Sequence, residues 1–275
     1  MKERPLAIDL FCGLFGWAEG LTAEGWRVVG FDLEDMCAQF GVSRPPHVRL
    51  VIQDVLTLHG SQFRNVDLIV ASPPCQEYSY MAMPWSLAKA KAKAIRADTS
   101  GKMLADLNRL FEACFRIQKE ASFAAGRHIP LVVENVRGAQ PWVGCARWNF
   151  GSFYLWGDVP ALMPITLRRQ VMKDGIAHRS NGAINFHGHT KNDGSGWREN
   201  GTLISCNRMV PDRVPSRADK DDDAGLKCGG DWFGPGVKSA MREHSSKSPA
   251  RKMASAMIAK IPLPLARHIA ATYRR

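Results

Sequence analysis

Four short apolar runs at an almost constant interval constrain the fold more than any other feature of this sequence. They are rich in Val, Ile and Leu without strict alternation, as in parallel strands that are buried on both faces. The runs are residues 6–11, 27–32, 48–54 and 67–72. The residues that mark their ends follow one another at intervals of 23, 22 and 21: they are Asp9, Asp32, Asp54 and Cys75. This spacing predicts a repeated unit of one strand and one helix, with right-handed crossovers.

The next part of the chain predicts two further strands and a long helix. Residues 128–136 and 151–158 are the candidate strands, and residues 81–101 form a mixed, basic stretch that we expect to be a long loop with a partial helix. Apolar side chains at helical spacing precede the fifth strand. They are Met103, Leu104, Leu107, Leu110, Phe111, Cys114 and Phe115. We therefore expect an α/β fold with a mostly parallel, doubly wound sheet.

The amino-acid composition of the chain changes at about residue 165. Eleven of the 24 glycines lie between Gly175 and Gly236, among Asn, Asp, Arg and His, which predicts a loop-rich insert. An apolar pattern returns near the C-terminus, where Pro262 and Pro264 separate two helical pieces. The predicted domains are residues 1–164 for catalysis and cofactor binding, 165–238 for the insert, and 239–275 for helices that return to the first domain.

Charge and cysteine content narrow the class of protein. The formal net charge of +11 favours a polyanionic partner such as nucleic acid, although solubility alone is an alternative reason for such a charge. No apolar run approaches the ~18 residues of a membrane span, and the first residues do not resemble a secretory signal. The seven cysteines include no Cys-x-x-Cys pair, which favours free thiols in a reducing compartment. We expect a soluble, cytoplasmic monomer.

Polar and small residues at the predicted strand ends suggest a nucleoside cofactor. Gly13 and Gly16 follow the first strand, where a ligand could approach the backbone closely, although a simple turn is the commoner reason for such glycines. Asp32 is placed to accept hydrogen bonds from ribose hydroxyls, and Asp54 to hold an adenine amino group. Each aspartate could equally cap the helix that follows it. Their occurrence in series favours the cofactor.

Cys75 and Glu134 follow the fourth and fifth strands, which are neighbours in many doubly wound sheets. A cysteine there could be filler, a metal ligand or a nucleophile. A buried carboxyl group at a strand end is costly unless it is functional or well bonded. A thiol and a carboxyl group together suit covalent addition to a ring whose nitrogen is protonated at the same time.

Three motifs in this order resemble those of the DNA cytosine-5 methyltransferases: "DLFCGLFG", "SPPCQEYS" and "VVENVRG". The likeness covers most of residues 6–157 and, more faintly, 240–272, but not the insert. It implies a Rossmann-like S-adenosylmethionine-dependent methyltransferase fold, in a compact member of prokaryotic or phage type that serves restriction-modification or phage DNA modification. It further implies that residues 165–238 form a small target-recognition region and that the partner is duplex DNA.

The resemblance implies a role for each matching residue. Cys75 would attack carbon 6 of a flipped-out cytosine, and carbon 5 would then take a methyl group from S-adenosyl-L-methionine. Glu134 would bond the ring nitrogen and amino group, Asn135 would hold the loop that carries Cys75, and Gln76 and Ser79 would position the nucleotide. The cofactor pocket would be lined by Phe11, Gly13, Gly16, Asp32, Leu33, Asp54 and Pro74.

The sequence departs from the family pattern at three places. Phe15 replaces the middle glycine of Gly-x-Gly-Gly, which puts the cofactor loop and strict cofactor choice in doubt. Arg147 is the best candidate for the arginine of the eighth motif, with Arg168 and Arg169 behind it. The C-terminal Gly-Asn-x-Val motif is replaced by residues 258–261.

Basic side chains identify candidate DNA contacts. Lys89, Lys91, Lys93 and Arg96 lie in a segment that resembles the family's mobile loop over DNA, although a solvated helix face is an equal alternative. In the insert, the candidates for reading base edges are Arg179, Asn181, Arg198 and Asn200.

Other functions remain open from the residues alone. They are the same chemistry on RNA, transfer of a group other than methyl, a non-catalytic nucleic-acid-binding protein on this fold, and a dinucleotide oxidoreductase, which the incomplete G-x-G-x-x-G disfavours. We expect no metal, because the spacing of His187, His189, Cys206 and Cys228 matches no common zinc pattern.

Overall fold

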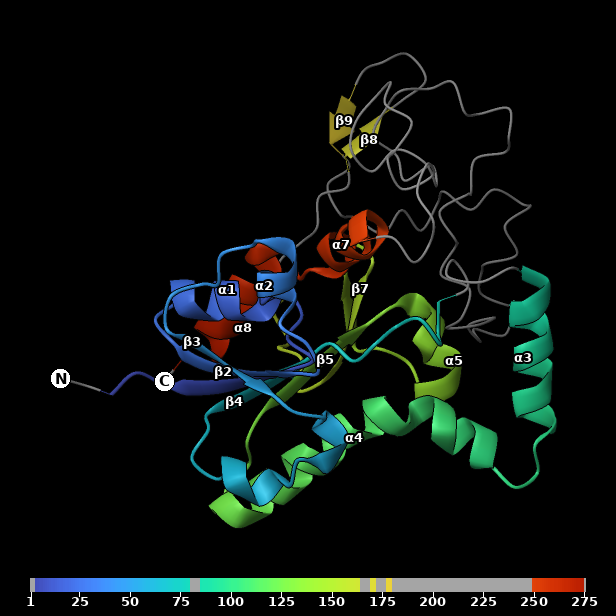
Figure 1. The fold of residues 1–275 in the computed structure, drawn as a ribbon, viewed down its shortest axis with the longest axis horizontal. Helices are drawn as coiled ribbons and strands as arrows, with labels where there is room; N and C mark the ends of the chain where they lie inside the picture. Colours follow the sequence, from blue (N-terminus) through green and yellow to red (C-terminus); the bar gives the residue numbers. More distant parts are fainter. Residues whose placement is uncertain (1–2, 80–84, 164–168, 172–176, 180–248, 275) are drawn as a thin grey trace, which may run out of the picture. The chain divides into compact units, whose positions relative to one another are not determined.

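The computed structural model describes residues 3–79, 85–163, 169–171, 177–179 and 249–274. The chain divides into two compact units, Met1–Pro164 with Ala256–Arg275, and Ile165–Ser255. The first unit contains a seven-stranded sheet in the order β3-β2-β1-β4-β5-β7-β6 (Figure 1). Its strands are β1 (Leu6–Leu10), β2 (Arg27–Asp32), β3 (Val48–Ile52), β4 (Leu68–Ala71), β5 (Leu131–Asn135), β6 (Trp148–Phe150) and β7 (Phe153–Gly157).

The first five strands are parallel, as the apolar runs predicted. The sixth predicted strand contains β7, which runs antiparallel to β5. The three-residue strand β6 was not predicted, because it is too short for an apolar pattern and pairs only with β7. The predicted fold class, an α/β fold with a mostly parallel sheet, is confirmed.

Both faces of the sheet are covered, which explains why the strands lack strict alternation. In β1, Ala7 belongs to one apolar cluster while Ile8 and Leu10 belong to the other. The first cluster lies under α1 (Gly16–Ala23) and α8 (Leu263–Tyr273), and the second lies under α4 (Lys102–Ala125) (Figure 1). Helices α1 and α8 can approach closely because Gly20 has no side chain. A Cβ added to Gly20 would lie only 2.3 Å from the Cβ of Ala266.

The connections between strands contain short helical elements and one helix that the sequence only partly predicted. They are α2 (Met36–Phe40), η1 (Val55–Thr57), η2 (Gly60–Phe63), η3 (Arg137–Ala139) and α5 (Gln140–Val143). The basic stretch that we expected to be mostly loop contains α3 (Trp85–Ala97), a regular helix. Ala88, Ala92 and Ile95 are buried on one side of α3, which gives this helix a packed face.

In the second unit, the described elements are the antiparallel hairpin of β8 (Arg169–Val171) and β9 (Ala177–Arg179), and the first part of α7 (Pro249–Ala259). The prolines Pro262 and Pro264 separate α7 from α8 as predicted, and Pro264 lies in the first turn of α8. None of the helices in the described ranges is long and apolar enough to cross a membrane.

Candidate active site

The carboxyl ends of the parallel strands bring the predicted chemical groups to one edge of the sheet. Strand β4 lies between β1 and β5, and Ala71 at the end of β4 pairs with Val133. Ser72 therefore lies level with Glu134, and the turn with Cys75 follows directly. Asp32 ends the neighbouring strand β2. In open parallel sheets this edge is where ligands bind.

Glu134 is a buried carboxyl group that keeps its proton at neutral pH. Its exposed fraction is 8%, and burial raises its pKa to about 8, although a hydrogen bond with the side chain of Ser72 acts in the opposite direction. The indole Nε1 of Trp17 donates to the Ser72 hydroxyl oxygen over 3.0 Å. Because Ser72 accepts from Trp17, its own hydrogen is available for the carboxyl group. No sequence pattern pointed to Trp17, whereas Ser72 lies inside the motif of Cys75.

Cys75 lies half-buried in the turn after β4. Its carbonyl oxygen accepts hydrogen bonds from the backbone N–H groups of Tyr78 and Ser79, over 3.0 and 2.9 Å. Burial raises the pKa of the thiol, and the negative charge of Glu134 raises it further. Cys75 is therefore a thiol at neutral pH, and Glu134 is near enough for its charge to affect the thiol.

Asn135 lies beside Glu134 and holds the segment that precedes Cys75. It is almost fully buried, and its side-chain Nδ2 donates to the carbonyl oxygen of Pro73 over 2.9 Å. Its Oδ1 accepts from the N–H of Val136 over 2.8 Å, which fixes the orientation of the amide. One end of the Cys75 turn is thereby attached to β5.

Asp32 and Asp54 both bond to the backbone near the carboxyl ends of β2 and β3. The two oxygens of Asp32 accept from the N–H groups of Gly13 and Leu33, over 2.9 and 2.8 Å. Asp54 caps η1 by accepting from the N–H of Leu56 over 2.9 Å. Capping of the next helix is the local role that the sequence left open, and it holds for Asp54, whereas α2 is capped by Asp35 and not by Asp32. Each carboxylate oxygen of Asp32 and Asp54 has a second lone pair that is available to a ligand.

Phe15 occupies the position of the missing glycine without entering the space beside the strand ends. Its backbone is left-handed, with φ 58°, and its side chain is buried in the core under α1. The ring packs over β2, where a Cβ added to Gly30 would lie only 2.6 Å from the Phe15 Cε1 atom and 2.8 Å from the Cys12 Sγ atom. Gly30 therefore provides the room that Phe15 requires.

Asp9 is a buried acid for which the sequence predicted no role beyond marking the end of a strand. Among the described residues, neither of its carboxyl oxygens has a hydrogen-bond partner; the N–H of Ala18 is near enough to lower the pKa slightly. Burial, followed by the charge of Asp32, raises the pKa of Asp9 well above its ordinary value. A neutral carboxyl group thus lies beneath the glycine turn, beside the thiol of Cys12.

The remaining predicted residues are distributed unevenly around this edge. Gln76 and Pro74 are exposed, Ser79 is half-buried, and all three flank Cys75. Phe11 has a left-handed backbone after β1, and the side chain of Leu33 is 66% exposed. Gly16 is explained by packing, since an added Cβ would lie 2.4 Å from the backbone nitrogen of Ile261.

Arg147 does not join Cys75 and Glu134. Its backbone N–H donates to the carbonyl oxygen of Leu155 at the start of β6, so β7 separates it from β5. Its charge acts on Tyr273, whose hydroxyl donates to the carbonyl oxygen of Asp158 at the opposite edge of the sheet. A catalytic role for Arg147 stays a prediction without geometric support.

Lys91 and Arg96 of α3 each contact a neighbouring side chain. The ammonium group of Lys91 bonds to the carboxylate of Glu77, and the guanidinium group of Arg96 lies 5.3 Å from the centre of the Trp142 ring. Lys89 and Lys93 are exposed. Arg179 ends β9, whereas Arg168, Asn181, Arg198, Asn200 and the His and Cys residues of the insert lie outside the described residues. Within the described ranges, no three His, Cys, Asp or Glu side chains gather as metal ligands.

Together, the sheet order with an antiparallel β7 and the thiol and carboxyl groups at its edge define the Rossmann-like methyltransferase class. Residues 6–138 match the sequence family described as C-5 cytosine-specific DNA methylase. The matched segment includes Cys75, Glu134 and Asn135. No curated protein matches the sequence significantly.

Several solved structures are similar to parts of this chain. An E. coli protein described as a DNA modification methyltransferase encoded within a prophage has 23% identity and a TM-score of 0.31, with 49% of this chain and 33% of that chain covered. The S. pombe Dnmt2 methyltransferase has 14% identity and a TM-score of 0.32, with 52% and 37% covered. The Entamoeba histolytica methyltransferase EhMeth has 15% identity and a TM-score of 0.31, with 52% and 41% covered. The matched part spans about a third of the first of these structures.

Proposed function

We propose that this chain transfers a methyl group from S-adenosyl-L-methionine to carbon 5 of a cytosine in duplex DNA, through a covalent adduct of Cys75. The observation that carries the proposal is the position of the Cys75 turn and of the buried, protonated Glu134 at the ends of the neighbouring strands β4 and β5. The match of residues 6–138 to the C-5 cytosine-specific DNA methylase family supports methyl transfer to cytosine.

Cys75 and Glu134 supply complementary steps of this reaction. The Cys75 thiol first loses its proton to solvent. Addition of the sulfur to carbon 6 then moves an electron pair into the ring, and this charge is neutralised when Glu134 gives its proton to the ring nitrogen. Because burial keeps Glu134 protonated at neutral pH, the proton is available when the sulfur adds. Carbon 5 then becomes nucleophilic. Loss of the carbon 5 proton to solvent, return of the ring proton to Glu134 and departure of the Cys75 thiolate complete the cycle.

The residues at the ends of β1, β2 and β3 fit the cofactor. S-adenosyl-L-methionine supplies, when bound, an electrophilic methyl group on a sulfonium sulfur. Asp32 and Asp54 keep acceptor capacity for ribose hydroxyls and an adenine amino group, and Leu33 offers an exposed apolar side chain to the ring. Gly13, with φ +48°, leaves the space beside its backbone open, since the nearest atom to an added Cβ is the Met36 sulfur at 3.8 Å. Phe11, Gly16 and Pro74 complete the proposed surroundings.

The substrate must present its cytosine outside the helical stack, because atoms inside a duplex cannot reach a thiol at the edge of a sheet. Gln76 and Ser79 flank Cys75 and are proposed to contact the flipped nucleotide. The exposed Lys89 and Lys93 of α3 are proposed to meet phosphates. Residues 165–238 are proposed to provide target recognition, with Arg179 and Asn181 among the candidates.

Transfer of a group other than methyl was suggested only by Phe15. Its ring is buried in the core over Gly30, so it does not enlarge the space at the strand ends. This observation favours the ordinary methyl donor.

The test is incubation of the protein with S-adenosyl-L-methionine and either mixed-sequence duplex DNA or RNA of the same sequence, followed by nucleoside mass spectrometry. We expect 5-methylcytosine in the DNA arm, and none with the Cys75→Ser variant. Methylation confined to the RNA arm would replace the proposed substrate. A methylated product that forms equally well with Cys75→Ser would exclude the covalent route.

A further inference from the structure

The turn that carries Cys75 is fixed at both ends, and the first attachment is the side chain of Asn135. The second attachment is the side chain of Tyr78. We propose that Tyr78 is a positioning residue for the Cys75 nucleophile and that it acts through a buried hydrogen-bond network with Asn108 and α5. This inference rests on the proposed function, since it assigns how the reactive thiol of that function is held.

The network is buried and its directions are determined. Tyr78 is 3% exposed and Asn108 is 4% exposed. The Tyr78 hydroxyl lies 3.1 Å from the carbonyl oxygen of Leu107 and 3.1 Å from Oδ1 of Asn108, and these two acceptors share its single hydrogen. The Asn108 Nδ2 donates over 2.9 Å to the carbonyl oxygen of Trp142 in α5, which fixes the orientation of the amide. A buried acceptor such as Asn108 Oδ1 is costly to leave unpaired.

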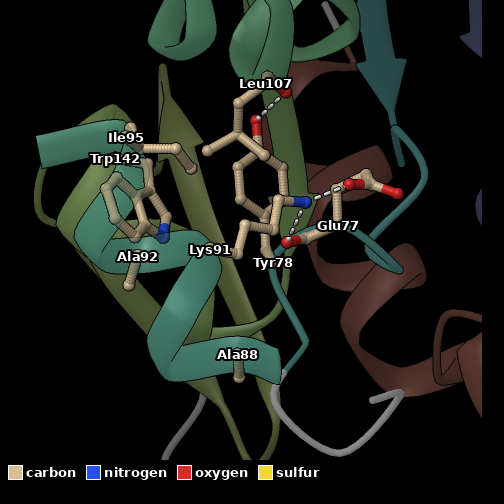
Figure 2. Close-up of a pocket in the computed structure, with 8 residues that line it drawn as sticks. All are labelled: Glu77, Tyr78, Ala88, Lys91, Ala92, Ile95, Leu107 and Trp142. Atoms are coloured by element: carbon tan, nitrogen blue, oxygen red, sulfur yellow. Dashed lines mark hydrogen bonds and ion pairs between the residues drawn. The ribbon is translucent and has the colours of Figure 1, made fainter. Parts of the chain in front are cut away.

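The same network reaches Cys75 through the backbone. The carbonyl oxygen of Cys75 accepts from the N–H of Tyr78 over 3.0 Å, so a shift of Tyr78 moves the residue that bears the thiol. Figure 2 shows the ring of Tyr78 between α3 and the Leu107 carbonyl, with Lys91 bonded to the neighbouring Glu77. Arg96 stacks on Trp142, which accepts from Asn108. Helix α3 therefore contacts the turn through Lys91 and Glu77, and α5 through Arg96 and Trp142.

Tyr78→Phe tests the inference because it keeps the ring and removes only the hydroxyl. Tyr273→Phe is a matched control, since the Tyr273 hydroxyl also donates to a backbone carbonyl, that of Asp158, at the opposite edge of the sheet. Both variants should show a similar, small fall in melting temperature, because each loses the hydrogen bonding of one hydroxyl. We expect only Tyr78→Phe to slow formation of a covalent complex with a 5-fluorocytosine duplex, by roughly 10-fold or more, with DNA affinity unchanged.

Alkylation of Cys75 by iodoacetamide, followed at the peptide level by mass spectrometry, gives a readout that needs no catalysis. Release of the turn should expose the half-buried thiol, so the alkylation rate should rise by about threefold or more in Tyr78→Phe and stay unchanged in Tyr273→Phe. A loss of fold would instead speed modification of the buried Cys114 as well.

Asn108→Ala and the double variant decide whether the two residues act as a unit. If they do, the double variant should slow covalent trapping little more than either single variant does. Trapping and alkylation rates of Tyr78→Phe that both stay within about twofold of the parent protein, or that match those of Tyr273→Phe, would overturn the inference. If the parent protein forms no covalent complex, the proposed function fails, and the alkylation comparison still decides the role of Tyr78.

Discussion

The burial of Glu134 lowers the free energy of unfolding of the protein at neutral and higher pH. Its folded-state pKa of about 8 lies above the ordinary 4.5, because the carboxyl group is removed from water. Below about pH 4.5 both folded and unfolded states carry the proton, and the burial has no pH-linked cost. As pH rises from there to about 8, only the unfolded state gains by ionising, and the free energy of unfolding falls.

We therefore predict that Glu134→Gln changes the pH dependence of stability. The variant should be more stable than the parent protein at pH 8, by up to a few kcal/mol at about 1.4 kcal/mol per pKa unit, and this advantage should disappear towards pH 4. Urea unfolding at several pH values measures it. The exposed Glu34→Gln is the control. An advantage that is the same at pH 4 and pH 8 would contradict the assigned pKa.

The same substitution should lower the pKa of Cys75. Ionised Glu134 raises the pKa of the thiol, so removal of this charge should shift the pH midpoint of Cys75 alkylation downwards. The shift should appear above about pH 8, where the parent Glu134 is charged. Peptide-level alkylation of the parent protein and of Glu134→Gln measures it. Equal midpoints in the two proteins would show that the two groups are not coupled.

At the scale of elements, the turn between β1 and α1 and the strand β2 have complementary shapes. Phe15 fills the space that Gly30 leaves, so we predict that Gly30→Ala destabilises the protein and that this cost shrinks in a Phe15→Ala background. Phe15→Ala alone should cost about 3–5 kcal/mol, the usual range for a buried aromatic side chain. Thermal and urea unfolding of the four proteins gives the coupling. Strictly additive losses would refute the pairing.

The elements also show what sequence can and cannot reveal. Continuous apolar runs predicted the five parallel strands, and their regular ends predicted that Cys75 and Glu134 would meet, since neighbouring parallel strands end at one edge. The bond from Trp17 to Ser72 and the link from Tyr78 through Asn108 to Trp142 join residues 55, 30 and 34 positions apart, and no local pattern records such pairs. Arg147 was chosen from its place before an apolar run, but the antiparallel β7 separates it from the site. The sequence predicted only part of helix α3, because the buried face of this helix consists largely of alanines.

At the scale of the whole molecule, the net charge of +11 predicts binding to DNA that weakens steeply with salt. If the exposed Lys93 of α3 meets a phosphate, Lys93→Gln should reduce the slope of log affinity against log salt by about 0.9. The exposed Lys119 of α4 is the matched control, and its substitution by Gln should leave the slope unchanged. Fluorescence anisotropy with a labelled duplex at several salt concentrations measures both. Equal slopes for Lys93→Gln and the parent protein would remove α3 from the DNA interface.

The most direct test of the account is the mass of the protein after incubation with S-adenosyl-L-methionine and a duplex in which 5-fluorocytosine replaces cytosine. After methyl transfer, fluorine at carbon 5 cannot leave as a proton does, so the sulfur adduct should persist, and the intact mass should increase by that of one DNA strand and one methyl group, with the attachment mapped to Cys75. The Cys75→Ser variant should show no such species. An adduct at another residue, or full methylation of ordinary duplex DNA by a protein that never forms this adduct, would contradict the central claim.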